Sequence, residues 1–180
     1  MVHVKQTQRA WMMFCILLTF WLSVLIRAFA WVMLLRNEGL VNQGLMALGL
    51  ISEPLPLVRN EFGVILGMVH FMLPLAVLPI FSNMSGIDGR YVSAARGLGA
   101  SPIGAFLHIY LPLSKPGLIA ATILVFVFSL GFFITPAILG GGKVVMISEY
   151  IRVSFEETLR WGQATMLAST LLFAVLLTLA

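Results

Sequence analysis

The chain has 180 residues, of which 60% are hydrophobic and only 10% are charged, and its mean hydropathy is +1.02. This composition excludes an ordinary soluble domain, whose surface has to be solvated, and indicates that the lipid bilayer is the solvent. The net charge of +4 comes from basic residues that are not clustered, which argues against a nucleic-acid partner. Cys15 is the only cysteine, so the chain has no internal disulfide.

Four stretches without charged side chains are about long enough to cross a membrane. They lie between Arg9 and Arg27 and over residues 62–87, 116–142 and 161–180. About 20 helical residues cross the hydrocarbon core of about 30 Å, and lipid offers no partners to the backbone of any other conformation. We therefore predict an all-α, polytopic transmembrane bundle. Its spans are expected at about 10–30, 61–82, 116–138 and 162–180.

The first stretch has an alternative interpretation as a cleaved secretory signal. Basic residues precede it, and Ala28-Phe29-Ala30 is similar to a cleavage site. We favour a retained helix because the apolar stretch is longer than an ordinary signal core and because three further spans follow it.

Basic residues near the span ends predict the orientation of the chain. The N-terminal segment, with Lys5 and Arg9, has no acid, and the loop over 83–115 has three basic residues against one acidic residue. Basic and acidic residues are equal in number over 27–61 and over 143–160. The positive-inside rule therefore places the N-terminus and the 83–115 loop in the cytoplasm and the other two loops outside.

Two short helices are expected in the outer loops. Residues 40–50 are compatible with an interfacial helix, and Ile147, Ile151 and Phe155 recur at helical spacing opposite a charged face. The second helix is therefore amphipathic. Its charged face is either a solvated surface with weak ion pairs or a docking surface for an external protein.

The cytoplasmic loop contains signals for a helical hairpin. Asp88 is a favourable N-cap, Gly99 suits a helix end, and Ser101 caps a second helix that begins at Pro102. Two further prolines, Pro112 and Pro116, are expected to end that second helix and to direct the chain back towards the membrane.

The first helix of the hairpin has a surface of small residues, with Ala94, Ala95 and Gly97 inside it. Such a surface permits insertion into a groove of a partner protein. The alternative is a structural hairpin that packs under its own bundle.

The loop resembles the signature loop of the permease subunits of binding-protein-dependent ABC importers. In that family, a Glu-Ala-Ala triplet is followed after three residues by Gly and after nine more by Ile-x-Leu-Pro. The residues that match here are Ala94, Ala95, Gly99, Ile109, Leu111 and Pro112. Ser93 departs from the pattern because it replaces the family's Glu, which puts in doubt any contact that this carboxylate makes.

The resemblance continues from about Leu22 to the end of the chain. The segments LIRAFAWVMLL and GFFITPAILGGGKVVM look like the spermidine/putrescine branch of these permeases. Permeases of this family usually have six spans, so the first two are expected to be missing here. Ala180 lies inside an apolar run, so the last span is expected to be cut short.

The resemblance implies a function in transport. The chain would form half of a translocation pathway for a small solute, such as spermidine or putrescine, in the inner membrane of a bacterial cell. The implied partners are a cytoplasmic ATPase dimer, a second permease subunit, an external solute-binding protein and membrane lipid. Ser93 and the six matching residues would couple the permease to the ATPase.

Residues inside the spans offer candidates for the pathway lining. His70 is ionisable, and such a residue in a span either bonds to a neighbouring helix or serves the substrate path. Pro74 and Pro79 in the second span and Gly131 and Pro136 in the third are expected to interrupt the helices. The candidate lining consists of His70, Phe132, Phe133, Thr135 and Pro136, with packing as the alternative role.

The sequence does not favour an enzyme. The spans hold no paired acids and no Ser with a base, and His3, His70 and His108 are too far apart for a metal site. Gly140-Gly141-Gly142-Lys143 fails as a phosphate loop because Ala137 and Val144 occupy two required positions, so a glycine-rich turn at a helix end is preferred. No cofactor is expected. The alternative functions are an ion-driven secondary transporter and a non-transport membrane assembly protein.

Overall fold

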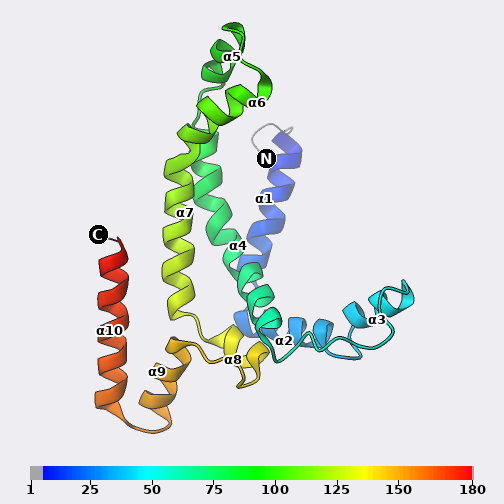
Figure 1. Ribbon diagram of the computed structural model, residues 1–180, viewed down its shortest axis with the longest axis vertical. Coiled ribbons are helices and arrows are strands. Elements are labelled where there is room, and N and C mark those ends of the chain that lie inside the picture. The colour runs from blue at the N-terminus through cyan, green and yellow to red at the C-terminus, as the bar shows by residue number, and fades with distance from the viewer. Residues whose placement is uncertain (1–5, 180) are drawn as a thin grey trace. The chain divides into compact units, whose positions relative to one another are not determined.

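The computed structural model describes residues 6–179, and all regular elements in this range are helices, which confirms the predicted fold class (Figure 1). His3, Lys5 and Ala180 lie outside the described residues. The chain forms two compact units. The first comprises Met1–Thr19 and Leu73–Phe126, and the second comprises Phe20–Met72 and Val127–Ala180.

The first unit contains most of α1 (Gln6–Trp21), the C-terminal part of α4 (Glu61–Ser85), and the segment from α5 to Phe126 of α7. The bounds in that segment are α5 Gly89–Gly97, α6 Pro102–Ala105, the π-helix η1 Phe106–Tyr110, and α7 Leu111–Gly131. The Arg9 guanidinium lies 4.4 Å from the ring centre of Phe81, which joins α1 to α4. A Cβ at Gly117 would lie 2.6 Å from the Cβ of Asn83, so α7 and α4 approach closely there.

The expectation that Pro112 and Pro116 end the second hairpin helix is wrong. Helical residues continue from Pro102 to Gly131 through both prolines. Pro112 falls in the first turn of α7, directly after the wide π turn of η1, where the backbone register changes. The Ser114 hydroxyl donates to the carbonyl of Tyr110 at 2.8 Å, one helical turn earlier.

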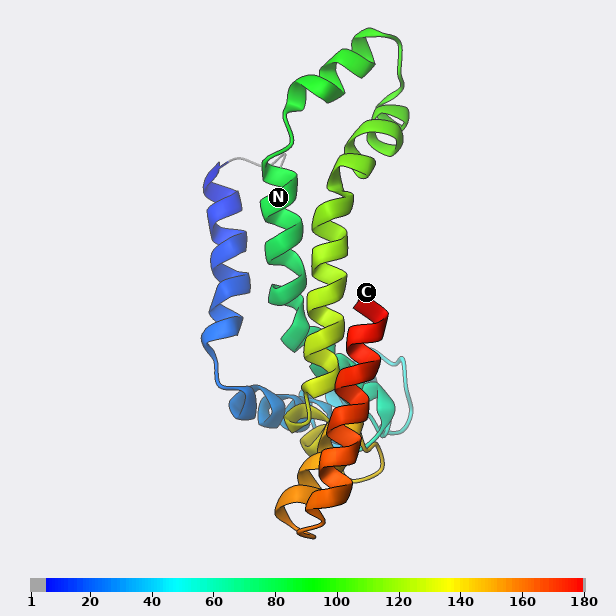
Figure 2. The ribbon, with the colours of Figure 1, turned by 90° about the vertical axis from the view of Figure 1, so that its left-hand side faces the viewer.

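The second unit contains the remaining helices, the N-terminal part of α4, the end of α7 and a small apolar core. The bounds are α2 Val24–Leu35, α3 Leu40–Ala47, α8 Ile134–Gly140, α9 Ile147–Glu156 and α10 Trp161–Leu179. Ala28 of α2, Val64 of α4 and Leu139 of α8 form the buried core. α9 and α10 lie side by side in both views (Figures 1 and 2).

Asn42 fixes the long connection between α3 and α4. Its side chain is fully buried, and its amide donates to the carbonyls of Arg36 and Leu55 at 3.2 and 2.9 Å. Its carbonyl oxygen accepts from the Leu55 N–H at 2.9 Å. One side chain therefore satisfies backbone groups of two loop segments that lack the regular backbone hydrogen bonds of a helix.

Among residues 6–179, three helical segments are long and apolar enough to cross a membrane, namely Glu61–Ser85, Pro102–Gly131 and Trp161–Leu179. The stretch expected as the first span is divided between α1 and α2, with a break at residues 22–23. It qualifies only as part of a bent pair, Thr7–Trp21 with Val24–Ala47. That this stretch crosses the membrane stays a prediction.

Several expected boundaries differ in detail from the helices. In the third span the helix ends at Gly131 and resumes as α8 at Ile134, whereas α4 continues through Pro74 and Pro79. The interfacial helix expected to Leu50 ends at Ala47. The amphipathic helix forms as α9, and the glycine-rich segment ends α8, with Gly141 left-handed at φ +56°.

Candidate functional site

The N-terminus of α5 is fixed by the side chain of Asp88, as the sequence predicts. Its Oδ1 accepts from the Arg90 backbone N–H at 2.9 Å, and its Oδ2 accepts from the Arg90 Nε–H at 2.7 Å. The side-chain hydrogen bond from Arg90 holds the pKa of the Asp88 carboxyl below its ordinary value. The carboxylate thus starts the helix and neutralises the first basic side chain of the loop.

Gly99 ends α5 in a Schellman motif. Its φ is +91°, a left-handed conformation that glycine adopts without steric cost. The Ala100 N–H donates to the Ala95 carbonyl at 3.0 Å, and the Gly99 N–H donates to the Arg96 carbonyl at 3.0 Å. These bonds reverse the chain sharply and separate the two arms of the hairpin (green, Figure 2).

Ser101 and Pro102 begin the second arm in the predicted way. The Ser101 hydroxyl accepts from the Gly104 N–H at 3.0 Å, and Pro102 occupies the first helical turn. α5 packs against α6 and η1, so the two arms form one local structure.

The tip of the hairpin exposes apolar and small side chains. Leu98 is 90% exposed and Ile103 is 72% exposed. A Cβ added at Gly97 would meet no atom within 4 Å, and Ala94 is also exposed. An apolar tip beside a shallow surface of small residues can insert into a groove of another protein.

The structure divides the predicted coupling residues into two groups. Ser93, Ala94 and Gly99 are exposed on the hairpin, where the Ser93 hydroxyl donates to the Gly89 carbonyl at 3.2 Å, and Ala95 is half-buried. The other three residues lie in η1 and the first turn of α7. They are Ile109, Leu111 and Pro112.

The residues predicted to line the pathway do not form one surface. His70 accepts a hydrogen bond at Nδ1 from the Trp31 Nε1–H at 3.3 Å. A bond to a neighbouring helix is one of the two roles that the sequence predicts for His70. Phe132 stacks on Phe71 with 4.2 Å between ring centres. Phe133 instead contacts Arg152, whose guanidinium carbon lies 5.4 Å from the centre of the Phe133 ring.

Thr135 and Pro136 are buried in the second unit. A Cβ at Gly67 of α4 would lie 2.7 Å from the Thr135 Cγ2, so the two helices touch at this point. Pro136 is among the most deeply buried side chains. In this conformation both residues are in packing positions.

Arg27 is a structural feature that the sequence analysis did not single out. Its side chain is only 7% exposed, and its guanidinium lies 4.7 Å from the ring centre of Phe71. Nε and Nη1 have no hydrogen-bond partner among the described residues. The available signal was a lone charge within a long apolar stretch, which is rare unless the side chain is paired or packed on an aromatic ring.

Within residues 6–179, no group of three or more His, Cys, Asp or Glu side chains is arranged to bind a metal ion.

The family described as binding-protein-dependent transport system inner membrane component matches residues 2–180. The spermidine/putrescine transport system permease protein PotB of Haemophilus influenzae is 34% identical over 178 residues, covering 98% of this chain and 62% of the relative. PotB of Escherichia coli K12 is 33% identical over 171 residues, covering 94% of this chain and 62% of the relative.

A further relative has a less specific name. The inner membrane ABC transporter permease protein YdcU of Escherichia coli K12 is 30% identical over 151 residues, covering 77% of this chain and 48% of the relative. The chain thus spans about three-fifths of the length of the two PotB proteins.

Proposed function

Because the chain belongs to the family of binding-protein-dependent transport system inner membrane components, we propose that it is a permease subunit of an ABC-type importer. The observation that supports this most directly is the hairpin of α5 and α6, which presents an exposed Leu98 beside the left-handed Gly99. The chain would form half of a translocation pathway and would supply no catalytic step.

Coupling would proceed through the hairpin. ATP would be hydrolysed on a separate cytoplasmic dimer, whose groove receives the tip of the hairpin. A movement of that groove displaces α5, and the continuous helical segment Pro102–Gly131 carries the displacement onward. Only contacts that differ between the nucleotide states can shift the permease between its two accessible forms. Ser93, Ala94, Ala95 and Gly99 would contact the ATPase, and Ile109, Leu111 and Pro112 would link the hairpin to α7.

The proposed substrate is a polyamine such as spermidine or putrescine. This rests on the names of the PotB relatives, which match nearly all of this chain. The proposed pathway residues are His70, Phe132, Phe133, Thr135 and Pro136. His70, Phe132 and Phe133 are half-buried and could become accessible in another conformation, while Thr135 and Pro136 would act by holding α8 against α4.

We further propose two protein partners and a membrane location. A second permease subunit would complete the pathway, and an external solute-binding protein would deliver the substrate. The protein would lie in a bacterial inner membrane, with the N-terminus and residues 83–115 in the cytoplasm. Membrane lipid would contact the exposed apolar faces of α4, α7 and α10.

Uptake by the reconstituted transporter tests the proposal. The chain is produced together with the ATPase, the second permease subunit and the binding protein of its own cell, and radiolabelled spermidine uptake into proteoliposomes is measured. Uptake that requires both ATP and the binding protein supports the proposal. Uptake driven by an ion gradient without the ATPase would favour a secondary transporter, and failure to purify with any ATPase would favour an assembly protein.

A further inference from the structure

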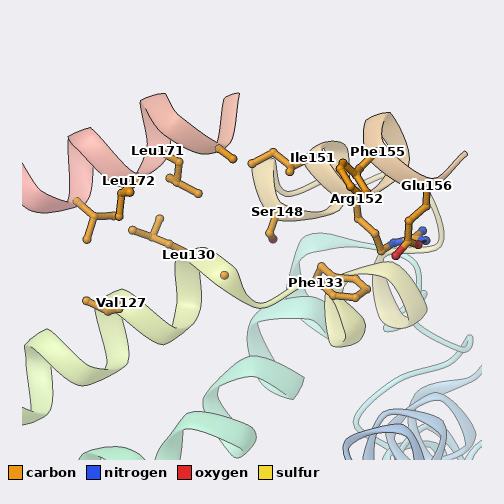
Figure 3. A pocket seen from close by; sticks show the side chains of 13 residues that line it. Val127, Leu130, Phe133, Ser148, Ile151, Arg152, Phe155, Glu156, Leu171 and Leu172 are labelled. Atoms are coloured by element: carbon orange, nitrogen blue, oxygen red, sulfur yellow. Dashed lines mark hydrogen bonds and ion pairs between the residues drawn. The ribbon is translucent and has the colours of Figure 1, made fainter. Parts of the chain in front are cut away.

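A cavity of about 500 Å³ lies within the second unit, between the end of α7, α9 and α10 (Figure 3). One face of α10 lines it, with residues at the spacing i, i+3, i+4 and i+7 that share a helix face. One face of α9 lines the other side at the same spacing. The α10 residues are Ala168, Leu171, Leu172 and Val175, and the α9 residues are Ser148, Ile151, Arg152 and Phe155.

The lining of the cavity is amphiphilic. Its polar side chains, Ser148, Arg152 and Glu156, all come from α9. Figure 3 shows the Arg152 and Glu156 side chains at one end, while Leu172 and Val127 lie at the opposite end. The cavity therefore has a long apolar part and one charged end.

The charged end has a definite bonding pattern. Arg152 donates from Nη1 to Glu156 Oε2 at 3.0 Å and from Nη2 to Glu157 Oε1 at 3.1 Å. Its Nε is screened from solvent and has no partner among the described residues. One guanidinium and two carboxylates leave an excess of negative charge that suits an ammonium group beside Glu156. Because both Nη groups of Arg152 already donate to carboxylates, the Nε–H is the donor left for a phosphate.

We propose that this cavity binds one phospholipid with a zwitterionic, ammonium-bearing headgroup of the phosphatidylethanolamine type. An acyl chain lies along α10, the phosphate lies beside Arg152, and the ammonium group lies beside Glu156. The inference goes beyond the transport function and does not depend on the identity of the substrate.

The two ends of the site contribute differently to selectivity. Bulk lipid is as apolar as the cavity wall, so enclosing an acyl chain gives little preference over the surrounding bilayer. Preference must come from the charged end, where charge-assisted hydrogen bonds to a phosphate are strong. An anionic headgroup would meet the excess carboxylate. A polyamine fits poorly because it has no acyl chain to fill the apolar part of the cavity, where every α10 side chain of the lining is apolar.

Retention of lipid by the purified transporter tests the acyl part of the site. The complete complex is washed with detergent, and phosphatidylethanolamine and phosphatidylglycerol per chain are measured by mass spectrometry. Ala168→Phe, which fills the cavity, should lower retained phosphatidylethanolamine by about tenfold. Ala174→Phe is the matched control, because Ala174 is an exposed alanine of the same helix outside the lining, and it should retain the lipid. Equal retention in both variants would overturn the proposal.

Competition in nanodiscs tests the headgroup. In an equal mixture of phosphatidylethanolamine and phosphatidylglycerol, the wild-type complex should be enriched in the former. Glu156→Gln should reduce this enrichment, while Glu149→Gln, outside the lining, should not. Equal binding of both lipids by the wild type would overturn the headgroup assignment.

Photocrosslinking separates a bound lipid from other occupants. A benzophenone side chain at Leu172 should crosslink to phospholipid in the washed complex, and one at Phe173, which does not line the cavity, should not. Equal crosslinking to lipid at both positions would indicate annular lipid only. Crosslinks from Leu172 to another protein would show that a partner helix fills the cavity. Either result would overturn the proposal, and neither depends on transport activity.

Discussion

The backbone N–H of Ala100 donates to the carbonyl of Ala95 at 3.0 Å, which closes a six-residue reversal around the left-handed Gly99. This single bond decides where α5 stops and how the second arm departs from it. Because a Cβ at Gly99 would meet no atom within 4 Å, the requirement for glycine there is conformational and not steric.

Gly99→Val should therefore weaken attachment of the ATPase through the backbone alone. A β-branched residue in a left-handed conformation costs on the order of 1–2 kcal/mol, so the hairpin would open or redirect Ser101 and Pro102. Co-purification of the ATPase with the variant measures the effect.

Two companion variants separate strain from loss of contact. Gly99→Asn should restore much of the binding, because asparagine tolerates the left-handed region. Gly89→Val adds the same side chain to open space at the start of α5, where φ is not positive, and should retain the ATPase. If Gly99→Val binds as well as the wild type, the hairpin is not the coupling contact.

The orientation can be tested by cysteine labelling in intact cells. Cys15→Ser provides a background without native thiols, since Cys15 is the only cysteine. A cysteine at Arg90 should be protected from an impermeant reagent applied outside, and one at Arg160 should react, because the positive-inside rule places residue 90 in the cytoplasm. The opposite pattern would invert the topology and remove the hairpin from reach of an ATPase.

Local signals in the sequence were sufficient for the hairpin. The Asp88 cap, the Gly99 reversal and the Ser101 cap each depend on hydrogen bonds within a few residues, so residue type and spacing determine them. The passage through Pro112 was not predictable in the same way. It depends on a π turn over Phe106–Tyr110, which has no simple composition signal.

Features set by contacts between distant residues were also missed. The break at residues 22–23 contains neither glycine nor proline, and the burial of Arg27 depends on the distant Phe71. Phe132 and Phe133 are adjacent in sequence but contact different partners, because α7 ends at Gly131, directly before them. Periodicity identifies apolar faces and cannot tell which of them meet.

Gly67→Ala should destabilise the second unit. The new methyl group would lie 2.7 Å from Thr135 Cγ2 and 3.1 Å from Leu139 Cδ2, both on buried side chains that have little room to move. Overpacking of this kind costs about 1–3 kcal/mol. Gly162→Ala, where a Cβ meets nothing within 4 Å, is the control and should be neutral or slightly stabilising. Thermal unfolding in detergent compares the two, and equal melting temperatures would contradict the close contact of α4 with α8.

Ala95→Glu should impair coupling, whereas Ser93→Glu should not. Ala95 is half-buried on α5, so a long charged side chain there would displace the small-residue surface from an apolar groove. Ser93 is exposed and stands where the resembling permeases carry a carboxylate, so glutamate adds the same charge at a position that can accommodate it. Neither change touches an apolar span, and both variants should reach the membrane at wild-type levels. ATPase co-purification and ATP-dependent uptake are measured for each. Loss of both activities in Ser93→Glu as well would mean that added charge anywhere on α5 is harmful, and retention in both would make the hairpin a structural element without a partner.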